Sequence, residues 1–200
     1  YVPCTWTGAA GDGDIDNKDN WENGGYSYWS SNALLDFSHA TEPIVLKDNT
    51  EYVEAAIAFL PPKGAEGTLK LVNAAGKNNS FKLRGVQKKS FRSTAFCRKG
   101  CAIEFDVKFK NYDSWPQIGW CGGGTFRFCR ELDAGCPNYF LLDGVVEIAS
   151  TLKPSTGLRF FALHGSTDRA VVRFVDGADV SLSETLTLDN NDGYTSGHAY

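Results

Sequence analysis

Residues 102–109 read AIEFDVKF, and this stretch decides the fold class. From Ile103 onward, apolar and charged side chains alternate without a break. Such alternation is typical of a half-buried β-strand, because successive side chains of an extended chain point to opposite faces. The stretch therefore predicts a strand with one charged face and one apolar face, the latter formed by Ile103, Phe105, Val107 and Phe109.

Weaker forms of the same pattern fill much of the chain, separated by Gly, Pro, Asn and Asp, which favour turns. Residues 49–60 carry the end signals of a helix, with Thr50 as cap and Pro61 as stop, yet they also alternate. Their β-rich surroundings favour a strand. The sequence thus predicts an all-β fold, with further strands at 80–86, 125–129, 145–148, 158–163, 170–175 and 180–188.

The spacing of these strands suggests an architecture. Four predicted strands, near Leu83, Phe105, Phe126 and Val146, are centred about 20 residues apart, which is typical of stacked β-coils. This spacing favours a parallel β-solenoid. Closer strands in the second half leave a two-sheet β-sandwich or jelly roll as the alternative. We expect one domain over residues 1–200, with an acidic Gly/Asn-rich loop at 1–30 and a polar tail at 189–200.

Composition narrows the class of protein. The 200 residues carry a net charge of -4, which argues against nucleic-acid binding, since that usually needs a clustered basic face. No apolar run has the roughly 20 residues of a membrane span, so we expect no membrane insertion. The chain begins with Tyr1 and contains no Met, which predicts the removal of an N-terminal segment such as a signal peptide.

Six cysteines support an oxidising compartment. A zinc site is disfavoured, because the C-x-x-x-C of Cys97 and Cys101 lacks a matching second pair and no His lies near it. Disulfide bonds are therefore expected in a secreted or cell-surface protein. Six cysteines allow about 15 pairings, among which sequence cannot choose. Our working assignment is Cys97–Cys101, Cys121–Cys129 and Cys4–Cys136.

An acidic loop near the N-terminus is a candidate metal site. Residues 5–25 read TWTGAAGDGDIDNKDNWENGG, with Trp6 and Trp21 bracketing four aspartates. The first three aspartates have the spacing that begins an EF-hand loop, but the turn glycine and the bidentate Glu of that motif are missing. A solvated turn is the alternative. If a cation binds, we expect Ca²⁺, held by Asp12, Asp14, Asp16 and Asp19.

Two aromatic clusters are candidate sugar sites, because flat rings stack on sugars while nearby polar groups hold the hydroxyls. Packing in a β core is the ordinary alternative for such rings. One cluster contains Tyr28 and Trp29. The other contains Tyr112 and Trp115, with Asp113 and Gln117 as polar neighbours.

The acidic loop also carries a resemblance. Its Trp-x-Gly, Gly-Asp-Gly and Asn-Trp elements resemble the start of bacterial autotransporter-like and surface-sorted β-solenoid passenger proteins, and residues 118–126 and 175–180 are similar to their coil starts and turns. Six cysteines and a length of 200 residues depart from that family. The resemblance implies a cell-surface location, a scaffold, adhesion or binding role, and no catalytic residues. The matching residues are Trp6, Gly8, Gly11, Asp12, Gly13, Asn20 and Trp21.

We therefore expect a non-catalytic extracellular structural or adhesive surface protein, with a subunit of a larger assembly as one form of this role. Its expected partners are other copies of itself, surface proteins or glycans. A carbohydrate-binding module that uses the exposed aromatics is the first alternative. A small secreted glycoside hydrolase is the second, since such an enzyme needs only two placed carboxylates. The acidic residues on or near strands are Glu104, Asp106, Glu131, Asp133 and Glu147.

Overall fold

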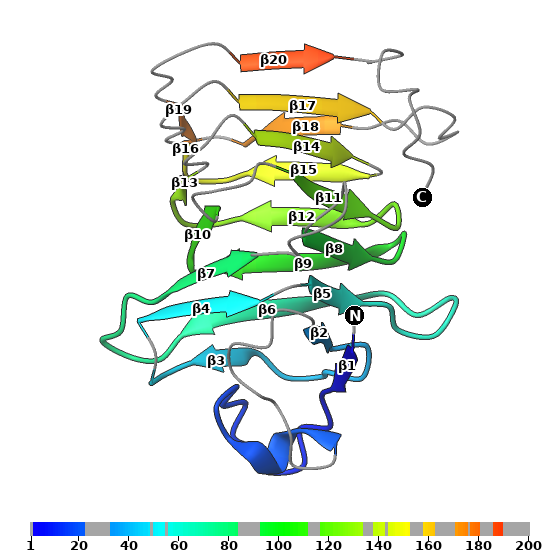
Figure 1. Ribbon diagram of the computed structural model, residues 1–200, viewed down its shortest axis with the longest axis vertical. Coiled ribbons are helices and arrows are strands. Elements are labelled where there is room, and N and C mark those ends of the chain that lie inside the picture. The colour runs from blue at the N-terminus through cyan, green and yellow to red at the C-terminus, as the bar shows by residue number, and fades with distance from the viewer. Residues whose placement is uncertain are drawn as a thin grey trace.

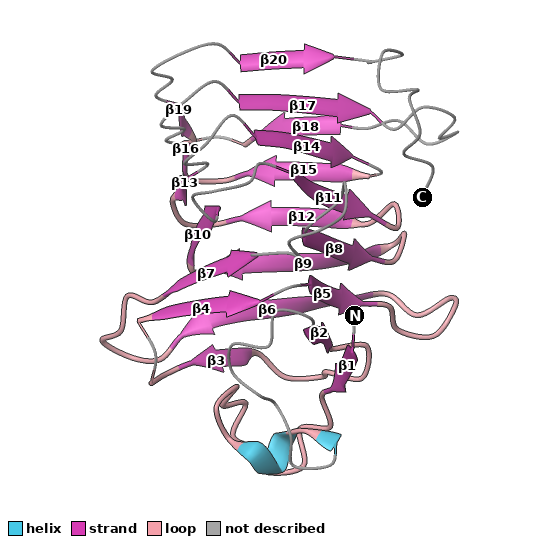
Figure 2. Cartoon of the chain, in the orientation of Figure 1, coloured by secondary structure: helices cyan, strands magenta, loops and turns pink. Residues whose placement is uncertain are grey.

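The computed structural model is built from strands in three parallel sheets (Figures 1 and 2). It describes residues 2–22, 33–48, 50–54, 56–83, 93–111, 117–133, 138–142, 144–152, 158–162, 171–175, 177–180 and 186–189. The helical structure within these ranges is limited to short 3₁₀ turns such as η1 (Lys18–Asn20), and no described helix has the length and hydropathy of a membrane span. The predicted all-β class is confirmed.

The strands are listed here by sheet, in the order in which they pair. The first sheet contains β1 (Val2–Thr5), β2 (Ala33–Asp36), β5 (Ala56–Phe59), β8 (Ser93–Cys97), β11 (Gln117–Cys121), β14 (Asn138–Leu142), β17 (Leu158–Ala162) and β20 (Leu186–Asp189). The second contains β3 (Ile44–Leu46), β6 (Gly67–Asn73), β9 (Cys101–Asp106), β12 (Thr125–Phe128), β15 (Val145–Ile148) and β18 (Val171–Phe174). The third contains β4 (Glu51–Glu54), β7 (Ser80–Leu83), β10 (Lys108–Asn111), β13 (Leu132–Asp133), β16 (Thr151–Leu152) and β19 (Asp179–Val180).

From β2 onward, the chain visits the three sheets in a fixed rotation. Apart from β2, which also pairs with β1, each strand pairs only with strands three places before or after it. Each sheet therefore gains one strand per round of the chain. All pairs between these strands are parallel, for example β9 with β12 and β12 with β15. This differs from the antiparallel pairing of the two-sheet sandwich or jelly roll, the alternative that the sequence left open.

The stretch that predicted the fold class forms two strands instead of one. Residues 102–109 bend at Val107, so that β9 lies in the second sheet and β10 in the third. The predicted apolar face survives the bend, because Phe105, Val107 and Phe109 are all at most 1% exposed. The prediction of one continuous strand is therefore wrong. At the corner, inward and outward residues continue to alternate, so the sequence pattern is the same with or without the bend.

Residues 49–60 also form two strands, β4 and β5, with no helix among the residues described there. The preference for strand over helix in this segment is confirmed. Tyr52, Ile57 and Phe59 are buried. Their apolar surface is covered by strands of the neighbouring rounds, an effect that outweighs the weak helix-end signals of Thr50 and Pro61.

Inward side chains stack into columns that run across the strands. In the second sheet, Leu71, Phe105, Phe128 and Ile148 follow one another in register, and each is at most 1% exposed. The rings of Phe105 and Phe128 stack with centroids 5.2 Å apart and planes 9° from parallel. Full burial of such a side chain stabilises the fold by about 2 kcal/mol. The core therefore consists of columns of apolar side chains. In each column, the side chain of one strand covers that of the neighbouring strand.

Candidate functional site

The acidic loop forms a cap over the N-terminal end of the sheets (Figure 1). We call residues 2–22 the N-terminal cap. Strand β1 pairs with β2 at the edge of the first sheet. Asp14 forms a parallel bridge with Val45 at the edge of the second sheet, where the Ile15 N–H donates to the Val45 carbonyl at 3.1 Å. The cap thus covers backbone groups that would otherwise be open to another chain.

Close approach at this second edge requires glycine at position 13. The residue has φ of +67°, and a Cβ added there would lie 2.5 Å from the Pro43 carbonyl oxygen. The Val45 N–H donates to the Gly13 carbonyl at 2.8 Å. Gly13 therefore belongs to the contact between cap and sheet, because only glycine adopts this conformation in this space.

Asn20 holds the loop of the cap together from a fully buried position. Its Nδ2 donates to Asp12 Oδ1 at 2.6 Å and to the Asp14 carbonyl at 3.0 Å. Its Oδ1 accepts from the Ala10 N–H at 2.9 Å. The backbone carbonyl of Asn20 also accepts from the Thr7 N–H at 2.8 Å. One side chain and one carbonyl therefore tie four points of the loop together.

Asp12 receives hydrogen bonds on both carboxylate oxygens. Asn17 Nδ2 donates to Oδ2 at 2.7 Å, and Asn20 and the Asp14 N–H donate to Oδ1. These bonds, with Asn17 the strongest contributor, lower the pKa of Asp12 below its ordinary value. Asp12 is thus held in its charged form by the protein's own donors.

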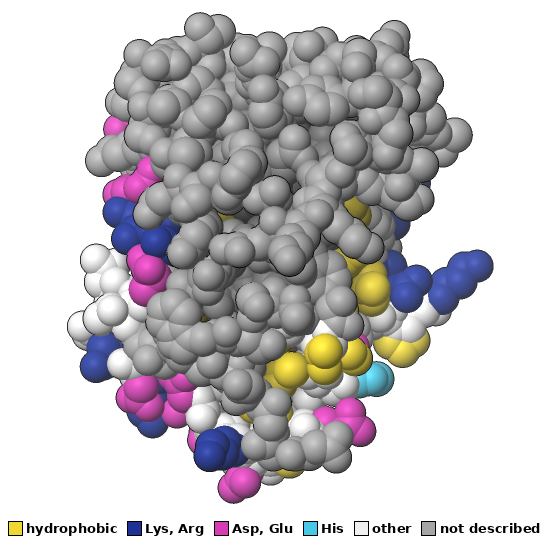
Figure 3. Space-filling view, viewed as in Figure 1, with side chains coloured by type: hydrophobic (Ala, Val, Ile, Leu, Met, Phe, Trp, Pro, Cys, Tyr) yellow, Lys and Arg dark blue, Asp and Glu magenta, His cyan; other side chains and the backbone are white. Residues whose placement is uncertain are grey.

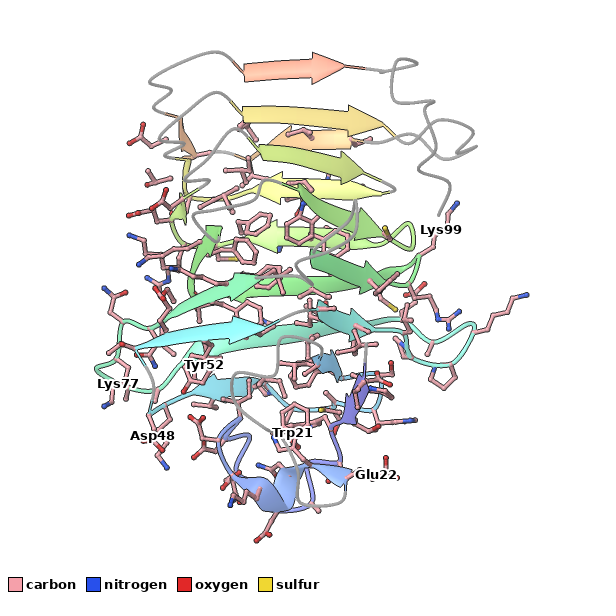
Figure 4. The ribbon with its side chains drawn as sticks, viewed as in Figure 1. Trp21, Glu22, Asp48, Tyr52, Lys77 and Lys99 are labelled. Carbon is pink, nitrogen blue, oxygen red and sulfur yellow. The ribbon has the colours of Figure 1, made fainter. Side chains whose placement is uncertain are left out.

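Asp14 and Asp16 turn to different partners from those of Asp12. Asp14 Oδ2 accepts from Lys47 Nζ at 3.0 Å. Asp16 Oδ2 accepts from the Tyr52 hydroxyl at 2.6 Å and lies beside Asp48, which Figure 4 labels next to Tyr52. These bonds fasten the cap to β4, through Tyr52, and to Lys47 and Asp48, which follow β3.

The four aspartates of the predicted calcium site have separate surroundings in the structure. Calcium ligands converge on one centre, whereas Asp12, Asp14 and Asp16 face separate donors, and Asp19 lies exposed on η1. No group of three or more His, Cys, Asp or Glu side chains in the described ranges is placed to hold a metal. Calcium binding at the acidic loop remains a prediction for a titration to test.

The two tryptophans that bracket the loop pack into the core. Trp6 and Trp21 meet edge to face with centroids 5.1 Å apart, and both contact Phe37. Trp21 Nε1 donates to the Ile15 carbonyl at 2.9 Å. Figure 4 places Trp21 inside the lower end of the molecule. At 1% and 3% exposure, these rings anchor the cap and are not presented to a ligand.

The predicted sugar-binding residues fall largely beyond the described ranges. Tyr28, Trp29, Tyr112, Asp113 and Trp115 lie outside the described residues. Gln117 begins β11, and only its backbone is described. The aromatic sites therefore stay predictions.

The expected disulfide bonds are not formed in the part of the chain that the structure describes. Cys97, Cys101 and Cys129 are free thiols, so Cys97–Cys101 and Cys121–Cys129 are both unbridged. Cys97 Sγ is directed to the Arg98 carbonyl and Cys101 Sγ to the Ala65 carbonyl, so these two thiols have separate partners.

For Cys121 and Cys129, the intervening strand gives the physical reason. β12 lies between the two cysteines in the chain, and its first and last Cα atoms are about 10 Å apart. A disulfide joins Cα atoms no more than about 7 Å apart. Cys136, the expected partner of Cys4, lies outside the described residues.

The acidic residues that a hydrolase would need are paired with basic residues. A column of alternating charge crosses the outer face of the second sheet, and we call it the charged ladder. Arg127 Nε contacts Glu147 Oε2 at 2.7 Å and Arg127 Nη1 contacts Glu104 Oε2 at 3.7 Å. Lys70 Nζ lies 3.6 Å from Glu104 Oε1. In strand order, the ladder consists of Lys70, Glu104, Arg127, Glu147 and Arg173.

Two further acidic candidates, Glu131 and Asp106, also face basic side chains. Glu131 pairs with Lys108, and Asp106 pairs with Arg130 at 2.5 Å. Basic and acidic side chains accordingly adjoin one another along one side of the molecule (Figure 3). A glycosidase needs two carboxyl groups that flank a sugar bond, whereas these carboxylates face basic side chains. Sequence reasoning missed the ladder, although residues of opposite sign recurring at the strand spacing were a readable signal.

Comparison with protein-family models, with curated proteins and with solved structures gave no match. The cap, the columns and the charged ladder are therefore the features that bear on function.

Proposed function

We propose that this chain is a parallel β-solenoid with a non-catalytic structural or adhesive role outside the cell, as a subunit of a larger assembly. The observation that supports the solenoid is the fixed rotation of strands through three parallel sheets. A chain that coils in this way stacks each round on the one below and builds a rod, as repeat proteins do. The extracellular location rests on the resemblance carried by residues 5–25.

The ion pairs favour a structural role over catalysis. Glu104, Glu131 and Glu147 each face a basic side chain across neighbouring strands. Alternating charges along a sheet stabilise the stacking of strands and keep the outer face soluble. The N-terminal cap adds to this argument, because a structural rod needs an end that does not pair indiscriminately.

The location is tested by antibody labelling of intact cells of the source organism. A surface role predicts labelling without permeabilisation, and its loss after brief protease treatment of the intact cells. Signal that appears only after permeabilisation would contradict the extracellular role.

The rod and the absence of catalysis are tested on the purified protein. Small-angle scattering should give a long axis along the direction in which the strands stack. A compact, nearly spherical envelope would contradict the solenoid. Turnover of any member of a broad panel of chromogenic glycosides, lost on substitution of Glu104 or Glu147 by Gln, would replace the structural role with the hydrolase alternative.

A further inference from the structure

At the end of the second sheet that lies away from the cap, an inward-facing aromatic side chain is partly exposed. Strand β18 is the last described strand of that sheet and pairs with β15 on one side. Phe174 continues the column that contains Phe128 and Ile148, but it is 40% exposed, whereas those two residues are at most 1% exposed. An inward-facing ring is thus left partly in water where the next round would cover it.

The backbone of β18 also has N–H groups that point to the side away from β15. The N–H groups of Val171 and Val175 donate to carbonyls at the β15 side, at 2.9 and 3.1 Å. In a parallel ladder, alternate residues of a strand bond to opposite neighbours. The N–H groups of Val172 and Phe174 therefore point away from β15, toward the side where no described strand of this sheet lies.

The charged ladder specifies the sign of a side chain placed on that side. Its charges alternate from Lys70 through Glu104, Arg127 and Glu147 to Arg173, which ends it. The guanidinium of Arg173 pairs with Glu147 below it, and its side chain is 56% exposed. An acidic side chain in the next register position would continue the alternation, and a basic one would repel Arg173.

From these three observations we propose that β18 binds an extended strand of a partner polypeptide, in which an acidic residue lies between two apolar residues. The apolar pair would cover Val172 and Phe174, and the acidic residue would pair with Arg173. Main-chain bonds to Val172 and Phe174 would supply affinity, as in other strand additions to a sheet edge. This inference rests on the proposed role as a subunit of a larger assembly, and it names the surface of that subunit and the chemistry of its partner.

The chain itself supplies a model of such a strand. Residues 144–150 read GVVEIAS, and they place Val146, Glu147 and Ile148 against Val172, Arg173 and Phe174 in parallel register. A fluorescent peptide of this sequence is the probe. Its matched control is the same peptide with Lys in place of the central Glu, which keeps the strand pattern and reverses the charge.

Fluorescence anisotropy with the full chain tests the proposal. The Glu peptide should bind about tenfold more tightly than the Lys peptide, as expected for exchanging an opposite-charge pair with a like-charge pair. Val172→Pro removes an N–H that points away from β15 and leaves the Val171 and Val175 donors in place, so it should abolish binding. Val172→Ala, which keeps the N–H, should retain most of it.

Circular dichroism of each variant shows whether it folds, and the two peptides give a comparison that needs no variant at all. Equal affinity for the Glu and Lys peptides, no binding to the folded wild-type chain, or full binding to folded Val172→Pro would each overturn the proposal. If the wild-type chain self-associates and Val172→Pro abolishes that self-association, the edge binds a second copy of this chain. That result would overturn the proposal of a different partner polypeptide. Surface labelling and the glycoside panel are independent of this edge, so their results separate a failure of the proposed function from a failure of this inference.

Discussion

Asn20 shows how one residue can decide the form of a loop. It is fully buried, and its amide bonds to Asp12, to the Asp14 carbonyl and to the Ala10 N–H. The resemblance of the acidic loop to surface proteins includes Asn20, but the sequence did not reveal what this side chain does. A buried amide that joins three points of a loop is visible only when the loop is closed.

Asn20→Ala should destabilise the fold by about 2 kcal/mol, because it leaves buried donors and acceptors unsatisfied. Urea unfolding followed by tryptophan fluorescence measures the change. Asn17→Ala is the control, since its bond to Asp12 is exposed and its loss should cost less. Equal losses in the two variants would argue against a special role for Asn20.

Asp12 should make the stability of the fold depend on pH. Its folded pKa is lower than its ordinary value of 3.8. The stabilisation is therefore complete above the ordinary pKa and is lost as pH falls through the lowered value. Unfolding of wild type and Asp12→Asn, followed over the acid range, should show a steeper acid loss in wild type. Parallel profiles would contradict this assignment.

The cysteines give a prediction on reactivity. Burial raises the pKa of the Cys97 thiol to about 12 and that of the half-buried Cys129 thiol to about 11. We expect iodoacetamide to label Cys129 before Cys97 in the folded protein, and to label both, with Cys101, after unfolding without reductant. Mass spectrometry reads the sites. If Cys97 and Cys101 stay unlabelled in the unfolded, unreduced protein, that result would support the disulfide predicted from the sequence.

At the scale of elements, neighbouring strands are held together by columns of side chains on both faces of the second sheet. Inward columns are apolar, and the outward charged ladder crosses five strands of the second sheet. Period-two alternation predicted which residues of 102–109 lie inward, and the structure confirms that all four are buried. The alternation did not predict the corner at Val107, because turning from one sheet to the next preserves the side that each residue faces.

Glu147 is the most buried acid of the ladder, with 5% of its side chain exposed between Arg127 and Arg173. Glu147→Gln should cost about 2 kcal/mol, the typical loss for hydrogen bonds to charged groups. Asp106→Asn is the matched control, because its partner Arg130 is 63% exposed and surface pairs contribute roughly 1 kcal/mol or less. Thermal and urea unfolding compare the two, and a larger effect at Asp106 would contradict the ladder's importance.

For the whole molecule, the two ends of the sheets differ. The N-terminal cap covers the edges of β2 and β3 with its own backbone. At the other end of the second sheet, the inward Phe174 is partly exposed. Because of this difference, we expect a partner strand to add to the sheets at the end away from the cap.

A chain that begins at residue 33 should therefore self-associate, because its β2 and β3 edges lose their covering strand and bridge. Light scattering over a series of concentrations measures this, with the full chain as control. The truncated chain should aggregate at concentrations at which the full chain does not. If it scatters like the full chain while folded, the cap does not protect the edge.

The sequence alone determined the all-β class and the inward or outward side of many residues, because both follow from local alternation along an extended chain. It also pointed to stacking, because strands of similar pattern recur at a nearly regular interval. Only the tertiary structure decided that the described strands form three sheets, that the acidic loop is a cap in which Asp14 and Asp16 bond to Lys47 and Tyr52, and that charges of opposite sign meet across neighbouring strands. These features join residues far apart in the chain, so they depend on register between rounds, which no local pattern contains.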